Sequence, residues 1–255
     1  MNTKMLSRVP EVTIYFWIIK VMATTIGETA ADFLSETLHL GLANTSYIMG
    51  ILLIIVLVNQ FRLKRYIPSN YWLAVVLISI VWTLITDRLV DEFHISLVTT
   101  TIFFTIALSA TFITWYMSEK TLSIHSIFTA KREAYYWLAI LFTFSLWTAS
   151  WDLLAEKLNI WYFTTALIIA WIIAFITIWF RYFRFNAILS FWLAYILTRP
   201  LGSSIWDLLA QPIKYWWLGF WTVNTSFIFF AVILAFVTYL SIIERTSKQT
   251  IPIED

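Results

Sequence analysis

Four aspartates at regular spacing are the residues of this sequence most suited to binding chemistry. Each follows a tryptophan by fifteen residues, and the pairs are Trp17/Asp32, Trp72/Asp87, Trp137/Asp152 and Trp192/Asp207. The eleventh residue after each tryptophan also carries a side-chain oxygen, and these residues are Glu28, Thr83, Thr148 and Ser203. Residues four apart share one face of a helix, so each oxygen adjoins its aspartate. The spacing predicts four equivalent helices that carry carboxylates and hydroxyls.

Lys20 and Arg199 are basic residues inside long apolar stretches. A charge within hydrocarbon costs roughly 2.5–3.5 kcal/mol on insertion scales, so each is expected to face the protein interior and to have a partner. Pro200 removes a backbone donor and predicts a bend or break in its helix, which would free carbonyl groups. Structural ion pairs are the alternative interpretation. The predicted binding set is Lys20, Thr24, Glu28, Asp32, Asp87, Asp152, Arg199, Ser203 and Asp207.

Two groups of carboxylates and histidine suggest a metal site. The groups are Asp32, Glu36 and His39, and Asp87, Asp91 and His94. Their spacing places each group on one helical face if the helix continues that far, with ligands suited to Mn²⁺, Zn²⁺ or Fe²⁺. Solvated polar loop faces are the alternative. A divalent metal ion is the cofactor that this pattern suggests.

The composition predicts an all-α integral membrane protein. Sixty per cent of the 255 residues are hydrophobic and 13% are charged. Apolar runs of about 20 residues suffice to cross a hydrocarbon core of roughly 30 Å. The predicted transmembrane helices lie at roughly 11–31, 43–61, 70–88, 97–117, 134–154, 161–180, 187–209 and 222–242. The chain is thus expected to form one transmembrane domain, 1–255, in contact with the lipid bilayer. Cysteine is absent, which excludes disulfides and thiolate ligands.

The distribution of basic residues predicts the orientation. When the helix ends are assigned alternately to two sides, twelve of the seventeen Lys and Arg residues fall on one side. Basic residues in short loops favour the cytoplasmic side. Both termini are therefore expected in the cytoplasm. Nucleic-acid binding has no support, because the basic residues are dispersed over several loops.

The tryptophan–aspartate pairs also predict internal repeats. The aspartates are 55, 65 and 55 residues apart, which divides the chain into halves 1–124 and 125–255. The four predicted two-helix repeats are 11–61, 66–117, 131–181 and 186–243. Because each repeat crosses the membrane twice, all four keep one orientation and are expected to surround a common axis. Repeats of this kind are typical of transporters.

Two segments carry a resemblance to a known family. They are Lys20-Val-Met-Ala-Thr-Thr-Ile-Gly-Glu-Thr-Ala-Ala-Asp32 and Leu197-Thr-Arg-Pro-Leu-Gly-Ser-Ser-Ile-Trp-Asp207. The chain resembles bacterial membrane proteins built from four tandem two-helix repeats of unknown function, each with a characteristic tryptophan. The resemblance covers nearly the whole chain and implies a location in the bacterial inner membrane. Trp82 and Trp147 stand where the family usually has glycine. The tryptophans are interpreted as interfacial aromatic belts, with a cage for a cation as the alternative.

These observations favour a transporter for a small polar or cationic solute, a divalent metal being one candidate. The solute would bind in a central polar cavity that opens toward the outer side. The alternatives are a membrane enzyme acting on a lipid or quinone, and a non-catalytic scaffold or assembly factor in which the ion pairs only hold helices together.

Overall fold

The computed structural model describes residues 7–158, 162–183, 186–210 and 222–249. Within these ranges the chain forms eight α-helices and no β-strand. The helices are α1 (Ile14–Asp32), α2 (Gly41–Arg62), α3 (Pro68–Asp87), α4 (Leu97–Glu119), α5 (Ala130–Leu158), α6 (Tyr162–Phe183), α7 (Ala187–Ala210) and α8 (Thr222–Gln249). Each overlaps one predicted apolar segment, so the all-helical prediction is confirmed.

Four segments of the described chain are long and apolar enough to cross a membrane. They are Gly41–Arg62, Pro68–Glu92, Leu97–Glu119 and Ala166–Phe183. An apolar stretch of 18 or more residues with few charges has the length and composition of a transmembrane helix. Phe230–Ile243 is a shorter apolar stretch within α8.

The helix starts follow from local capping chemistry. The Thr13 side chain accepts a hydrogen bond from the Phe16 amide before α1, and Ser96 accepts one from the Thr99 amide before α4. Pro68 occupies the first turn of α3, where its missing N–H costs nothing. These caps satisfy amide groups that have no partner within the helix.

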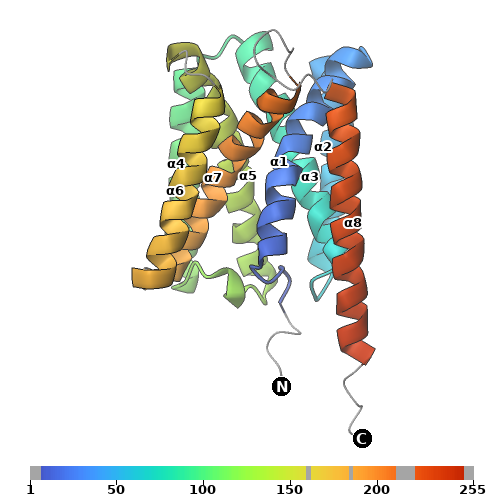
Figure 1. Ribbon diagram of the computed structural model, residues 1–255, viewed down its shortest axis with the longest axis vertical. Coiled ribbons are helices and arrows are strands. Elements are labelled where there is room, and N and C mark those ends of the chain that lie inside the picture. Colours follow the sequence, from blue (N-terminus) through green and yellow to red (C-terminus); the bar gives the residue numbers. More distant parts are fainter. Residues whose placement is uncertain (1–6, 159–161, 184–185, 211–221, 250–255) are drawn as a thin grey trace, which may run out of the picture.

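The four odd-numbered helices form an inner ring. In this ring α1 contacts α3 and α7, and α5 contacts the same two helices (Figure 1). The even-numbered helices lie outside, with α2 against α3, α4 against α5, α6 against α7 and α8 against α1. Each outer helix therefore packs mainly on the odd helix of the following repeat, and the last outer helix closes on the first inner one.

Burial separates these two layers. In an apolar 18-residue stretch of each segment, 56% of the residues are buried for α3, against 17% for α2 and 6% for α6. Large apolar side chains such as Ile51, Ile54 and Phe175 are exposed on the outer helices. Soluble proteins rarely expose contiguous apolar patches of this extent, whereas lipid accommodates them. The outer helices thus present the surface expected of a protein in a bilayer.

The first two repeats share an unusual turn after their inner helices. Both α1 and α3 end at the predicted aspartate and continue as a π-helix, Phe33–Thr37 and Arg88–Glu92. His39 and His94 then adopt left-handed backbone conformations with φ of 55° and 53°. The two turns are 55 residues apart, which matches the spacing of the aspartates.

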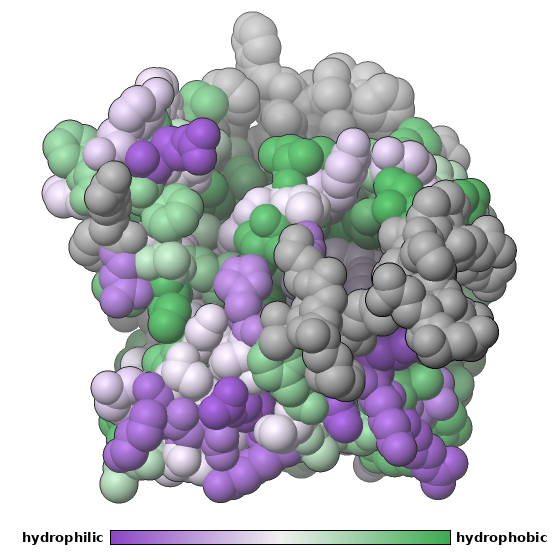
Figure 2. All heavy atoms as spheres, turned by 90° about the horizontal axis from the view of Figure 1, so that it is seen from below, coloured by the Kyte–Doolittle hydropathy of each residue, from purple (hydrophilic) through white to green (hydrophobic). Residues whose placement is uncertain are grey.

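The start of α1 and the end of α8 lie on the same side of the molecule (Figure 1). Figure 2 views this side, where hydrophilic side chains gather around the rim. Its basic residues are Arg8, Arg62, Lys64, Arg65, Lys120, Lys131, Arg132 and Arg181. We call this the basic end. The opposite, acidic end carries Asp32, Glu36, Asp87, Asp91 and Glu92.

Two expectations about single elements need correction. Pro200 does not break its helix, because α7 runs continuously through it from Ala187 to Ala210, and the alternative of a bend stays a prediction. Proline removes one backbone hydrogen bond, and neighbouring helices make such positions tolerable in membrane proteins. Trp72 and Trp192, which were expected in an interfacial belt, are instead buried in the core, as is the deeper Trp137. They pack with the aromatic residue that precedes each of them, which forms an aromatic layer inside the ring.

Candidate functional site

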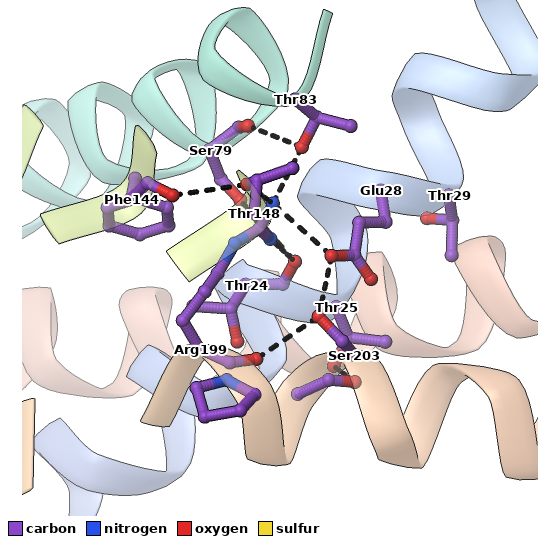
Figure 3. Close-up of polar contacts among 12 residues, drawn as sticks. Thr24, Thr25, Glu28, Thr29, Ser79, Thr83, Phe144, Thr148, Arg199 and Ser203 are labelled. Carbon is purple, nitrogen blue, oxygen red and sulfur yellow. Dashed lines mark hydrogen bonds and ion pairs between the residues drawn. The ribbon is translucent and has the colours of Figure 1, made fainter. Parts of the chain in front are cut away.

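Arg199 lies at the centre of the ring and is only 2% exposed (Figure 3). One terminal nitrogen donates to the Thr24 carbonyl oxygen at 2.8 Å and to Ser79 Oγ at 3.2 Å. The other donates to Thr83 Oγ1 at 2.7 Å and to Thr148 Oγ1 at 3.1 Å. These partners lie on α1, α3 and α5, so the side chain from α7 joins all four inner helices.

The hydroxyl groups around Arg199 are oriented as acceptors. Thr83 donates its own hydrogen to the Ser79 carbonyl, and Thr148 donates to the Phe144 carbonyl, both at 3.1 Å. A hydroxyl has one donor and two acceptor lone pairs, so this arrangement leaves lone pairs free for the guanidinium. The local helical bonds thereby prepare the site for a cation.

Glu28 supplies the carboxylate of the site. Ser203 Oγ donates to Glu28 Oε1 at 2.6 Å, and a terminal nitrogen of Arg199 lies 3.3 Å from the same oxygen. The Glu28 side chain is 15% exposed, in contrast to the fully enclosed guanidinium. An ion pair therefore links α1 to α7 on the acidic-end side of Arg199.

Lys20 is a second buried cation near this network. Its Nζ lies 3.7 Å from the ring centroid of Phe144 and 4.3 Å from that of Tyr195. Arg199 Cζ lies 5.4 Å from the same Phe144 centroid. Cations near aromatic faces are attracted by the ring quadrupole, and more strongly when water is excluded. Phe144 therefore contacts both buried basic side chains.

The site is built from equivalent positions of the repeats. The seventh residues after the four tryptophans are Thr24, Ser79, Phe144 and Arg199, and the eleventh are Glu28, Thr83, Thr148 and Ser203. Two layers of the ring thus receive one residue from every inner helix. Sequence analysis placed Thr24, Glu28, Arg199 and Ser203 in the site. It noted the side-chain oxygens of Thr83 and Thr148 without including them in the binding set, and it missed Ser79 and Phe144. Comparison of the repeats at the seventh position was the signal that would have found them.

Two glycines set the spacing of the inner helices. A Cβ atom added to Gly27 would overlap the side chain of Ser79, and one added to Gly202 would overlap that of Thr24. Both glycines are the tenth residue after their tryptophan and meet the seventh-position residue of a neighbouring helix. The equivalent Trp82 packs edge-on against Phe104 of α4 at 5.6 Å. Glycine therefore permits the close approach of α1 to α3 and of α7 to α1.

The predicted site residues meet directly at the depth of Arg199. Thr24, Glu28, Arg199 and Ser203 were expected to line an open space, yet in the described structure they are joined by direct contacts. Gly27 packs closely against Ser79 of α3 at the same level. Four of the predicted residues are therefore brought together by direct contacts.

The aspartates lie beyond this network, toward the acidic end. Asp32 and Asp87 are half-buried at the last positions of α1 and α3. Asp32 lies close enough to Glu28 and Glu36 for electrostatic repulsion between the carboxylates. The side chains of Asp152 and Asp207 lie outside the part of the structure that is described, so their predicted roles stay predictions.

The helical face assumed for the metal site does not continue as far as the histidines. The predicted site required a face that continues to His39 and His94, but π-helical turns and left-handed backbone intervene in both repeats. Among the described residues, no three His, Asp or Glu side chains are close enough to hold one metal ion. Asp32, Glu36 and His39 therefore do not form a preassembled site, and neither do Asp87, Asp91 and His94.

A second polar network closes the basic end of the ring. Glu133 is fully buried and forms an ion pair with Arg8 at 2.6 Å. Gln60 Nε2 donates to the other carboxylate oxygen at 2.9 Å, and Asn70 donates to Gln60 Oε1 at 2.7 Å. The network ties the segment before α1 to α2, α3 and α5. Sequence analysis missed it, because Glu133 stands near the start of a helix, where an acidic residue is common.

The fold and the site together define a class of protein: a ring of tandem helical hairpins with ionised groups at its centre. The chain belongs to the family described as Repeat of Unknown Function (DUF347), whose model matches residues 15–66, 70–121 and 190–246. These segments contain α1–α2, α3–α4 and α7–α8 with few residues missing, and they confirm the resemblance to a tandem-repeat family. No curated protein and no solved structure matches the chain.

Proposed function

We propose that this protein is a multi-pass protein of the bacterial inner membrane with eight transmembrane helices and both termini in the cytoplasm. The basic end, where α1 begins and α8 ends, would face the cytoplasm. The support is the concentration of Lys and Arg residues at this end together with the apolar outer helices.

Within that membrane, the protein would transport a small polar or cationic solute, divalent metal ions being one candidate class. The observation that carries this proposal is the Arg199 network, in which Arg199 and Glu28 meet hydroxyl groups from repeat-equivalent positions between the four inner helices. Ionisable groups within transmembrane segments almost always face the interior of the bundle, where they mark substrate and ion pathways. A position shared by all repeats is also where repeat transporters place their sites.

The charges suggest how a cation would enter. Carboxylates at the acidic end, including Asp32, would attract it toward Glu28. There it would compete with Arg199 for the Glu28 carboxylate, because both are cations that need the same oxygen. Loss of that ion pair would loosen α7 from α1 and open the network. Lys20 and Arg199 keep the empty site from carrying excess negative charge.

The decisive experiment is solute flux into proteoliposomes containing the full-length protein. We expect saturable flux of at least one cation from a panel of Mn²⁺, Zn²⁺, Mg²⁺ and small organic cations. Glu28→Gln and Asp32→Asn should abolish this flux while the protein remains folded. Asp91→Asn, which changes an exposed carboxylate at the same end, should retain it. Absence of flux for the whole panel, or unchanged flux in Glu28→Gln, would contradict the proposal.

The second candidate is a static scaffold, which the contacts of the two terminal nitrogens of Arg199 favour, although its buried Nε has no partner among the described residues. Both of its terminal nitrogens are fully engaged by protein acceptors. A static lock needs stability only, so the paired change Arg199→Met with Glu28→Gln should preserve cellular function if the double variant folds. A transporter loses function in the same variant, because the solute-binding carboxylate is gone.

A further inference from the structure

A pocket of about 520 Å³ lies at the basic end, apart from the Arg199 network. It is enclosed by the start of α1, the second half of α6, the start of α7 and the segment 122–125. Its walls are mostly apolar and include Val12, Trp17, Ile176, Phe180, Ile188 and Phe191. A concave apolar pocket of roughly 300–1,000 Å³ with a few polar groups is the usual form of a small-molecule site.

One polar group in this pocket has no partner. Ser190 is 7% exposed, and its Oγ makes no hydrogen bond in the described structure. Other helical serines of this chain, such as Ser145 and Ser204, donate to the carbonyl four residues earlier. A buried hydroxyl without a partner is unfavourable, and a hydrogen bond to a ligand oxygen would remove that cost. The pocket therefore suits an apolar molecule that carries a hydrogen-bond acceptor.

Basic residues adjoin the lining of the pocket in the sequence. His125 lines the pocket and is exposed. Lys120 and Arg181 are also exposed and stand one or two residues from the lining residues Leu122 and Phe180. Basic pockets between transmembrane helices on the cytoplasmic side recognise anionic lipid headgroups. The positive charge of these residues would thus favour an anionic amphiphile over a neutral one as the ligand.

We propose that this pocket binds one anionic phospholipid. An acyl chain would occupy the apolar space, the Ser190 hydroxyl would donate to an ester carbonyl, and the phosphate would lie against Lys120 and Arg181. The proposal is independent of transport, since the pocket shares no residue with the Arg199 network.

The test is native mass spectrometry of the delipidated full-length protein titrated with dioleoylphosphatidylglycerol or dioleoylphosphatidylcholine. We expect one phosphatidylglycerol per chain, bound about 30-fold more tightly than phosphatidylcholine if each basic residue contributes its usual share. Ala187→Phe, which fills the pocket, should abolish this binding. Ala170→Phe places the same ring on an exposed position of α6 outside the pocket and should bind as the wild type does.

The charge is tested separately with Lys120→Gln and Arg181→Gln together, which should remove the preference for phosphatidylglycerol. Arg62→Gln with Lys64→Gln, a matched change elsewhere at the basic end, should leave it intact. If Ala187→Phe impairs folding, Ser190→Ala provides the alternative, with binding weakened about two- to tenfold. Equal binding of both lipids would overturn the proposal. So would pocket-dependent binding of decylubiquinone without phosphatidylglycerol binding.

Discussion

Arg199 keeps its charge inside the ring because four oxygen atoms on three other helices face its guanidinium. An isolated charge would not be tolerated there, since desolvation costs several kcal/mol. The planar fork of arginine reaches several acceptors at once, which a lysine ammonium could not do from the same position.

Replacement of Arg199 by methionine should therefore destabilise the protein by about 3–5 kcal/mol, the usual cost of removing one partner from a buried charge pair. Thermal unfolding of the purified protein in detergent would measure this as a lowered Tm. Arg62→Met, at an exposed position of the basic end, is the control and should change the Tm little. Equal Tm values for the two variants would show that the central network contributes nothing to stability.

Phe144 contacts Lys20 and Arg199 through the face of its ring and makes no side-chain hydrogen bond to them. Phe144→Leu keeps an apolar side chain but removes the ring that contacts both Lys20 and Arg199. We expect a loss of about 1–3 kcal/mol of unfolding free energy, from two cation–π contacts and some packing. Phe103→Leu, on the exposed face of α4, provides the control in the same unfolding measurement. A smaller effect at Phe144 than at Phe103 would refute this role.

At the scale of elements, two glycine contacts decide how closely the inner helices pack. Gly27 meets Ser79 across the α1–α3 interface, and Gly202 meets Thr24 across the α7–α1 interface. The same contacts bring the acceptors of Arg199 within reach. Helix spacing and site geometry therefore depend on the same residues.

Gly27→Ala should separate α1 from α3 and cost about 1–3 kcal/mol, as overpacking does in other cores. Gly50→Ala is a matched control, because the added Cβ meets open space in the middle of α2. That change should be neutral or stabilising by about 0.5–1 kcal/mol through helix propensity. Adding Ser79→Gly to Gly27→Ala should restore part of the stability, and failure to do so would place the strain elsewhere.

The segment before α1 is held by the Glu133 network rather than by secondary structure. The Arg8 amide donates to the Ile127 carbonyl, and Arg8 pairs with Glu133. Removing the carboxylate charge with Glu133→Gln should loosen this segment. Trypsin cleavage at Arg8 would then accelerate at least several-fold. Glu119→Gln breaks ion pairs with Arg132 and Lys131 at the same end and should leave cleavage at Arg8 unchanged.

At the scale of the whole molecule, opposite charges occupy opposite ends of a ring whose outer surface is apolar. The absence of cysteine allows a direct test of the orientation, because single cysteines can be introduced without a background. In intact spheroplasts, a membrane-impermeant maleimide should label Asp91→Cys at the acidic end and not Lys64→Cys at the basic end. The reverse pattern would invert the proposed topology.

The ring closes because each outer helix packs on the next repeat, with α8 returning to α1. Such an arrangement makes every repeat depend on its neighbours, as in other repeat architectures. No single hairpin could bury its share of the central charges. The functional site is accordingly a property of the assembled ring.

The sequence by itself determined the helices, the repeat spacing and the separation of charge between the two ends. These follow from local properties: the length of apolar runs, the recurrence of tryptophan and aspartate, and the positions of basic residues in loops. It also indicated that Lys20 and Arg199 face inward, because the cost of a charge in hydrocarbon does not depend on the details of packing.

Only the tertiary structure decided which residues meet. The partners of Arg199 come from three other helices, and their rotation and height are set by contacts such as Gly27 against Ser79. Ser79 and Phe144 are ordinary residues in their own helices and acquire a role only beside a cation from another repeat. Burial of Trp72 likewise depends on neighbours that the local pattern does not specify. Distances between segments far apart in the chain are fixed by packing, which no local pattern encodes.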